Sequence, residues 1–168
     1  MIELYNFLEN NREQIISTLL ARVPKEIAAY SRVPRNELKQ SLEYLLEAYT
    51  DLLVTGEDGQ QRTYFKYLAK VRSAQSFTLS DAMHKLLLFL PVIRSMLQEE
   101  FRDVNGDGLT LFNTAMNQLE RTTYDSVCRF VDVFQEHLRS RIDEHNEYID
   151  EQNKQLGVDL SKFILFRG

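Results

Sequence analysis

The sequence predicts an all-α fold, either globin-like or a helical bundle with a long C-terminal helix. Apolar residues recur every three or four positions over most of the 168 residues, as one buried face of a helix requires. The apolar and polar alternation that is typical of half-buried strands is scarce. A stretch without proline or glycine runs from Leu109 to Leu156 and predicts one very long helix.

The first element is predicted to be a helix over about residues 2–22. Its apolar positions stop at Pro24, which lacks an N–H donor and crowds the preceding turn. A short turn of helix is expected over 25–30. Pro34 suits the first turn of the next helix, which ends near Gly56. The inward face of that helix is formed by Leu38, Leu42, Leu45, Leu46, Tyr49 and Leu52.

A surface loop is expected over Thr55–Gln61, because this segment is rich in glycine and acidic residues. The amphipathic helix that follows is predicted to end at about Gln75. Its inward-facing and neighbouring positions are Tyr64, Phe65, Leu68, Ala69, Val71 and Arg72.

The following helix is predicted to begin at Ser76 or Thr78, either of which could cap it. Asp81 would then lie near the positive end of the helix dipole. The apolar face runs over residues 86–97, and Pro91 within it should bend the helix because it removes one hydrogen bond.

The stretch FRDVNGDGLTLF reproduces the opening half of a calcium-binding EF-hand loop. Asp103, Asn105 and Asp107 alternate as the pattern requires, but its twelfth position is Thr114 instead of a bidentate Glu. Asp, Asn and Gly also favour tight turns. We therefore expect a turn between two helices, with a weak cation site as the alternative.

The last helix is predicted over about 110–155, which corresponds to a length on the order of 65 Å. Its apolar positions follow heptad-like spacing, and its composition becomes strongly polar toward the C-terminal half. We expect one helical domain over 1–168, with about 135–156 as a helix that projects from the bundle and can pair with another chain. The predicted seam of a homodimer comprises Phe130, Phe134, Leu138, Ile142, His145 and Ile149.

Charge and cysteine content narrow the possible environments and partners. The net charge of -5 argues against a broad nucleic-acid surface, which would need clustered Lys and Arg. The single cysteine, Cys128, fits a reducing compartment and is expected to be a small buried group. The start of the chain does not read as a secretory signal, and the longest apolar run, Leu86–Ile93, is too short to cross a bilayer. We expect a cytoplasmic protein without membrane insertion.

Catalysis and metal binding find little support in the sequence. The three histidines belong to no enzyme motif, and Asp81-x-x-His84 is a single copy of a pattern that di-iron bundles use in pairs. We therefore predict no catalytic residues, no metal and no cofactor. The alternative is haem, with His84 as axial ligand on a helix. The aromatic residues indicate ordinary core packing or a small apolar cavity for a ligand whose position the sequence does not reveal.

One stretch resembles a known family. Leu68, Ala69, Arg72 and Ala74 form an LA-x-x-R-x-A pattern, followed by Phe77, Leu79 and Asp81 and by the leucine-rich run 86–90. This region is similar to the N-terminal domain of RsbR/RsbRD-type co-antagonists, which also heads many bacterial sensor histidine kinases. The preceding ELKQSLEYLLEAYTDLLVTGE is similar to that family's second main helix and its loop.

The resemblance implies a haem-free, globin-like or bundle-like sensor that dimerises and passes a signal down its last helix to an output domain. The pathway would be a bacterial stress response or two-component signalling. Pro91 departs from the family pattern, and no STAS, kinase or cyclase domain follows in these residues. The chain is expected either to have lost its output domain or to act through a partner protein.

Overall fold

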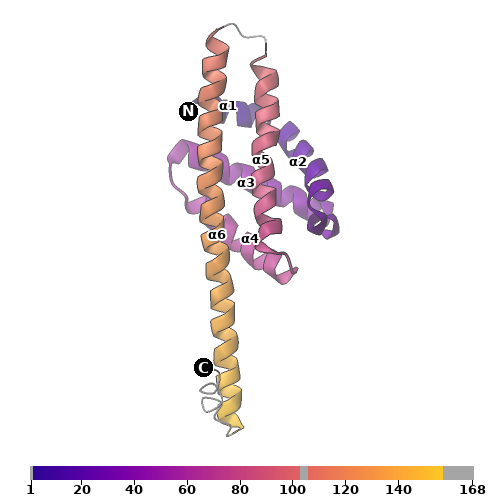
Figure 1. The fold of residues 1–168 in the computed structure, drawn as a ribbon, viewed down its shortest axis with the longest axis vertical. Coiled ribbons are helices and arrows are strands. Elements are labelled where there is room, and N and C mark those ends of the chain that lie inside the picture. Colours follow the sequence, from indigo (N-terminus) through magenta and orange to yellow (C-terminus); the bar gives the residue numbers. More distant parts are fainter. Residues whose placement is uncertain (1, 103–105, 157–168) are drawn as a thin grey trace, which may run out of the picture. The chain divides into compact units, whose positions relative to one another are not determined.

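A computed structural model describes residues 2–102 and 106–156 of the chain. Over these residues it contains helices and no strand (Figure 1), which confirms the all-α bundle with a long C-terminal helix. None of these helices is long and apolar enough to serve as a membrane span. In chain order the helices are α1 (Ile2–Asn10), α2 (Arg12–Glu26), the 3-10 helix η1 (Ala28–Arg32), α3 (Arg35–Thr55), α4 (Gly59–Ala74), α5 (Leu79–Glu100) and α6 (Asp107–Gln155).

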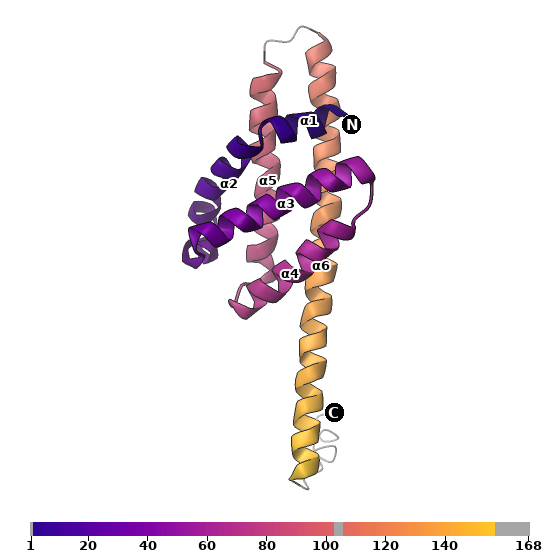
Figure 2. The same ribbon diagram turned by 180° about the vertical axis from the view of Figure 1, so that it is seen from behind.

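The chain divides into two compact units, Met1–Phe134 and Gln135–Gly168. In the first unit, α5 and the part of α6 up to Phe134 run side by side in opposite directions (Figures 1 and 2). The helices α1 to α4 lie across one face of this pair, and α2 contacts both α3 and α5. The first unit therefore encloses its core between two layers of helices.

Two groups of apolar side chains form that core. The larger group joins α1, α2, α3 and α5 to the start of α6. The smaller group joins α4 and α5 to α6 through aromatic rings, and the ring centroids of Phe65 and Phe130 lie 5.3 Å apart in an edge-to-face arrangement. Phe134 packs next to Phe130, with a centroid distance of 5.7 Å. Such ring pairs contribute about 0.5–1.5 kcal/mol beyond their burial.

Two boundaries near the N-terminus differ from the prediction. The helix predicted over 2–22 is interrupted at Asn11, whose side-chain amide donates to the same Phe7 carbonyl that its backbone N–H bonds. The predicted stop at Pro24 is wrong, since α2 continues to Glu26 and the Ile27 N–H still bonds the Val23 carbonyl. The short turn expected next is η1, a few residues later than predicted.

Other boundaries follow their local signals. Gly56 ends α3 with a φ of +71°, a left-handed conformation that L side chains adopt at a cost. Thr78 caps α5 in a reciprocal capping box with Asp81. The helix α5 continues through Pro91 to Glu100.

The EF-hand-like stretch is only partly described. Asp103 and Asn105 lie outside the described residues, so the predicted turn there remains a prediction. Asp107 begins α6, and the Thr114 hydroxyl donates to the Thr110 carbonyl within that helix. A calcium loop needs non-helical backbone across this segment, so the helix from Asp107 onward argues against the cation-site alternative.

Candidate functional site

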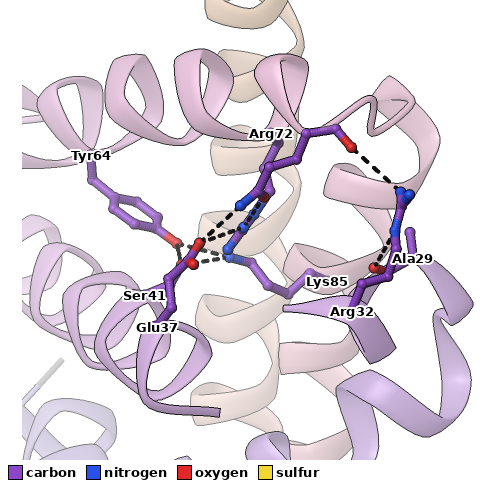
Figure 3. Close-up of polar contacts among 8 residues, drawn as sticks. Ala29, Arg32, Glu37, Ser41, Tyr64, Arg72 and Lys85 are labelled. Atoms are coloured by element: carbon purple, nitrogen blue, oxygen red, sulfur yellow. Dashed lines mark hydrogen bonds and ion pairs between the residues drawn. The ribbon is translucent and has the colours of Figure 1, made fainter. Parts of the chain in front are cut away.

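A cluster of polar side chains is buried in the first unit, between η1, α3, α4 and α5. Figure 3 shows the polar ends of several of these side chains converging there. Lys85 is 0% exposed and Arg72 is 1% exposed, although side chains of these types are almost never fully buried without a partner. The cationic cluster, as we name it, comprises Tyr30, Glu37, Ser41, Tyr64, Arg72 and Lys85.

Lys85 reaches the cluster because of its register on α5. It lies on the same helical face as Ala82 and Phe89, which are both in the core. Its Nζ donates to the Ser41 hydroxyl and to the Tyr64 hydroxyl, each at 3.0 Å. The two hydroxyls are also 3.0 Å apart and hydrogen bond to each other. The amine therefore completes a triangle of polar groups supplied by three helices.

Arg72 enters the cluster from α4. Its Nη1 donates to Glu37 Oε1 at 3.0 Å, which forms an ion pair between α4 and α3. The guanidinium carbon lies 5.1 Å from the centroid of the Tyr30 ring and 5.3 Å from that of Phe77, within cation–π range. The Glu37 side chain remains 31% exposed, so only the arginine side of this pair is fully removed from water.

The two basic side chains of the cluster differ in their partners, since Arg72 pairs with Glu37. No ion pair joins Lys85 to a carboxylate in the part of the chain that the structure describes. Burial lowers the pKa of the Lys85 ammonium well below its ordinary value, and the nearby positive charge of Arg72 lowers it further. Burial also raises the pKa of Tyr64, so that its hydroxyl keeps its proton.

Two polar atoms of the cluster have no hydrogen-bond partner. They are the hydroxyl oxygen of Tyr30 and Nε of Arg72, and both are buried. An unpaired buried polar group costs about 1–3 kcal/mol, so such groups are uncommon in native cores. Both groups can donate a hydrogen bond. They leave the cluster with two buried donors that an added acceptor group could bind.

A surface hollow of about 600 Å³ lies between α3 and α4 next to the cluster. Tyr44 and Tyr67 line it and are about half exposed, whereas Tyr64 is buried at its wall. Tyr64 therefore contacts both the hollow, which it lines, and the buried amine, from which its hydroxyl accepts a hydrogen bond. This hollow provides a candidate route to the cluster.

The residues predicted for the dimer seam fall into two groups. Phe130 and Phe134 are 0% and 2% exposed in the core of the first unit, so their rings are not at a surface where a second chain could contact them. Leu138, Ile142 and Ile149 of the second unit are exposed by 40%, 60% and 37%, and His145 is also exposed. The seam itself remains a prediction, and it now rests on Leu138, Ile142, His145 and Ile149.

Two further candidates lie on the surface. His84 is exposed on α5, so its imidazole does not lie in a buried pocket of the kind that the haem alternative requires. Cys128 is exposed, so the expectation of a buried thiol is wrong. Lys85 was missed in the sequence because lysine is usually a surface residue. Its position three residues after Ala82 and four before Phe89 is the signal that could have placed it in the core.

The fold and its site define an all-helical domain whose buried polar chemistry lies where α3, α4 and α5 meet. Residues 12–149 match the family described as the RsbT co-antagonist protein RsbRD N-terminal domain, and the chain belongs to this family. The resemblance noted in the sequence is thereby confirmed. The family is a regulatory one in stress-response signalling and is not known to be catalytic. No curated protein and no solved structure matches the chain.

Proposed function

We propose that this chain is a non-catalytic bacterial sensory domain that acts in the cytoplasm as a homodimer. In this proposal, the C-terminal part of α6 pairs with the same segment of a second chain. A change in the first unit is then relayed along α6 to an output domain or to a separate signalling partner. The observation that carries the proposal is the row of exposed apolar residues on an otherwise polar helix.

The spacing of this row supports pairing of two identical helices. Leu138, Ile142, His145 and Ile149 are separated by four, three and four residues, which matches alternating d and a positions of a heptad. The a positions then carry isoleucine, and one of the two d positions carries leucine. This combination favours parallel two-stranded coiled coils, in which both chains present the same end to an output domain.

The expected strength of the dimer is modest. The seam buries six apolar side chains, three from each chain. Each is about half exposed before pairing, so it contributes roughly half of the 1.5–3 kcal/mol of full burial, or roughly 5–9 kcal/mol in all. Association costs about 4–15 kcal/mol in lost translational and rotational freedom, so these residues alone support only a weak dimer. Weak pairing suits a relay, because a small change in the first unit can shift its equilibrium.

The relay would operate through α6 itself. This helix contributes Phe130 and Phe134 to the core of the first unit and the exposed row to the second. Repacking around the two phenylalanines would therefore act on the helix that carries the seam. A shift in the angle or register of paired helices is a known way for such domains to change state.

Oligomeric state tests the proposal. The wild-type chain should show a concentration-dependent rise in mass toward a dimer in sedimentation equilibrium. Ile142→Asp should keep the chain monomeric at every concentration, because a charge at an a position would be buried in the seam. Ser140→Asp, at an outer heptad position, is the matched control and should pair like wild type. An Ile142→Asp chain that still forms dimers would contradict the proposed seam.

A further inference from the structure

The cationic cluster has a property that its role in packing does not account for. Two cationic side chains are fully buried in it, and Glu37, the carboxylate that pairs with Arg72, is partly exposed. Two buried donors, the Tyr30 hydroxyl and Arg72 Nε, have no partner. A small anionic group attached within the cluster would accept hydrogen bonds from both donors.

We propose that Lys85 is a site of reversible modification by carbon dioxide, which converts its side-chain amine to a carbamate held by Arg72 and Tyr30. The carbamate oxygens would accept hydrogen bonds from the two buried donors that have no partner. This proposal does not depend on whether the chain forms a dimer.

The reaction needs no other reactant. The lone pair of the neutral Lys85 Nζ attacks the carbon of CO₂ and forms an N–C bond. One C–O π bond breaks, and its electron pair moves onto oxygen. An N–H proton then leaves, and the Ser41 and Tyr64 hydroxyls, each 3.0 Å from Nζ, offer it a path toward the hollow between α3 and α4. The product is an N-carboxylated lysine with one negative charge, and one proton is released.

The cluster favours the reactive form of this amine. An ordinary lysine, with a pKa of about 10.4, is neutral in only about one molecule in 2,500 at pH 7. Burial and the charge of Arg72 lower the pKa of Lys85, so a larger fraction of it is neutral. Lys85 faces groups from three elements. These groups are Tyr30 of η1, Ser41 of α3, and Tyr64 and Arg72 of α4. Glu37 of α3 forms an ion pair with Arg72. Among these, only Glu37 is negative, and it is engaged by Arg72.

The amine and the donors that would hold the carbamate meet at one aromatic ring, that of Tyr30. The Arg72 guanidinium and Lys85 Nζ lie over the same Tyr30 ring, at 5.1 Å and 5.5 Å from its centroid. Burial raises the pKa of the Tyr30 hydroxyl, which therefore remains a donor at neutral pH. A guanidinium and a phenol are both strong donors to a carboxylate-like group.

The first experiment traps the adduct on the intact chain. The protein is equilibrated with ¹³C-labelled bicarbonate and CO₂ in a sealed vessel, alkylated with a trialkyloxonium salt, digested, and its peptides analysed by mass spectrometry. We expect the labelled carboxyl group on the peptide that contains Lys85 and not on that of Lys66, which is exposed. No adduct on Lys85, or equal labelling of both lysines, would overturn the proposal.

Substitution of Tyr30 separates a specific site from a merely reactive amine. Tyr30→Phe removes only the hydroxyl and keeps the ring that Arg72 and Lys85 contact, and its melting temperature in CO₂-free buffer checks that the variant is folded. The labelled fraction at Lys85 should fall at least several-fold. Tyr67→Phe, in the exposed wall of the hollow, is the matched control and should leave the labelling unchanged. Equal labelling in Tyr30→Phe and wild type would overturn the assignment of Tyr30.

A third measurement distinguishes covalent from non-covalent binding. The ¹³C NMR spectrum of the wild type under labelled CO₂ should contain a carbamate resonance that is absent from Lys85→Met. The melting temperature of the wild type should rise with CO₂ at constant pH, and that of Lys85→Met should not. A rise that persists in Lys85→Met without a carbamate resonance would indicate bicarbonate binding and overturn the proposal.

Discussion

The two halves of α6 share one apolar spacing but differ in what covers it. Before Gln135, the positions that recur at helical intervals, such as Leu119 and Phe130, are fully buried. After it, Leu138, Ile142 and Ile149 continue the same spacing and are all exposed. Periodicity therefore identifies the face of a helix, whereas the neighbouring elements determine whether that face is a core or an open surface.

The largest expected effect comes from truncating a buried ring in the first half of α6. Phe130→Ala should lower the free energy of unfolding by about 3–5 kcal/mol, because it removes contacts with Phe65 and Phe134 and leaves a cavity. Ile142→Ala, in the second half, should change it by less than about 0.5 kcal/mol in dilute monomer. Urea denaturation measures both, and similar losses would contradict the contrast between the two halves.

Lys85 in the first unit should make stability depend on pH. Between its lowered pKa in the folded chain and about 10.4, the unfolded chain binds a proton that the folded chain does not. The free energy of unfolding should therefore rise with pH in this window, by at most about 1.4 kcal/mol per pH unit.

The Lys85→Met variant checks the sign of that slope. From neutral pH to about pH 9, below the ordinary pKa of tyrosine, it should show a smaller rise in stability than wild type. At pH 7 it should be at least as stable, because it replaces a buried amine that the unfolded chain can protonate with an apolar chain of similar length. Exposed Lys66→Met is the control and should keep the wild-type slope. Identical slopes in all three proteins would show that the pKa of Lys85 is not lowered in the folded chain.

Replacing His145, the polar residue of the proposed seam in the second unit, should strengthen dimerisation. His145 occupies a proposed d position, and His145→Leu would replace it with the residue that such positions favour. The dimer dissociation constant should fall by about tenfold or more, which corresponds to roughly 1.4 kcal/mol. Sedimentation equilibrium measures it, and unchanged or weaker pairing would contradict the heptad register.

The smallest effect concerns the start of α5, the helix that carries Lys85. Thr78→Ala removes the side chain that accepts a hydrogen bond from the Asp81 N–H and should cost about 1 kcal/mol. Thr63→Ala, within α4 and exposed, is a matched control without a cap to lose. Thermal unfolding compares the two, and equal changes would show that the capping box adds no stability.

Much of the fold could be predicted because its signals are local. The glycine that ends α3, the cap of α5 and the long proline-free stretch of α6 each depend on neighbouring residues in the chain. The break at Asn11 was missed because an asparagine side chain can bond the backbone without leaving a distinctive pattern. The helix through Pro24 was missed because a proline close to the end of a helix removes one hydrogen bond without ending the helix there, and the Ile27 N–H still bonds the Val23 carbonyl.

The candidate site was predicted less well. Arg72 appeared in the sequence as part of a family pattern, but Lys85 did not stand out among the basic residues. Phe130 and Phe134 were assigned to the seam because core and seam positions share the same spacing. Nothing local to either ring indicates that Phe65 of α4 packs against Phe130.

The sequence by itself determined the class of fold, the helices and the family, because these depend on periodicity, capping residues and short motifs. Only the tertiary structure decided which faces are covered and which groups change their ionisation. Lys85 acquires its surroundings from Ser41, Tyr64 and Tyr30, which lie far from it in the chain. Burial shifts the pKa of Lys85 only after these distant segments have packed around it, so the shift cannot be predicted from neighbouring residues in the chain.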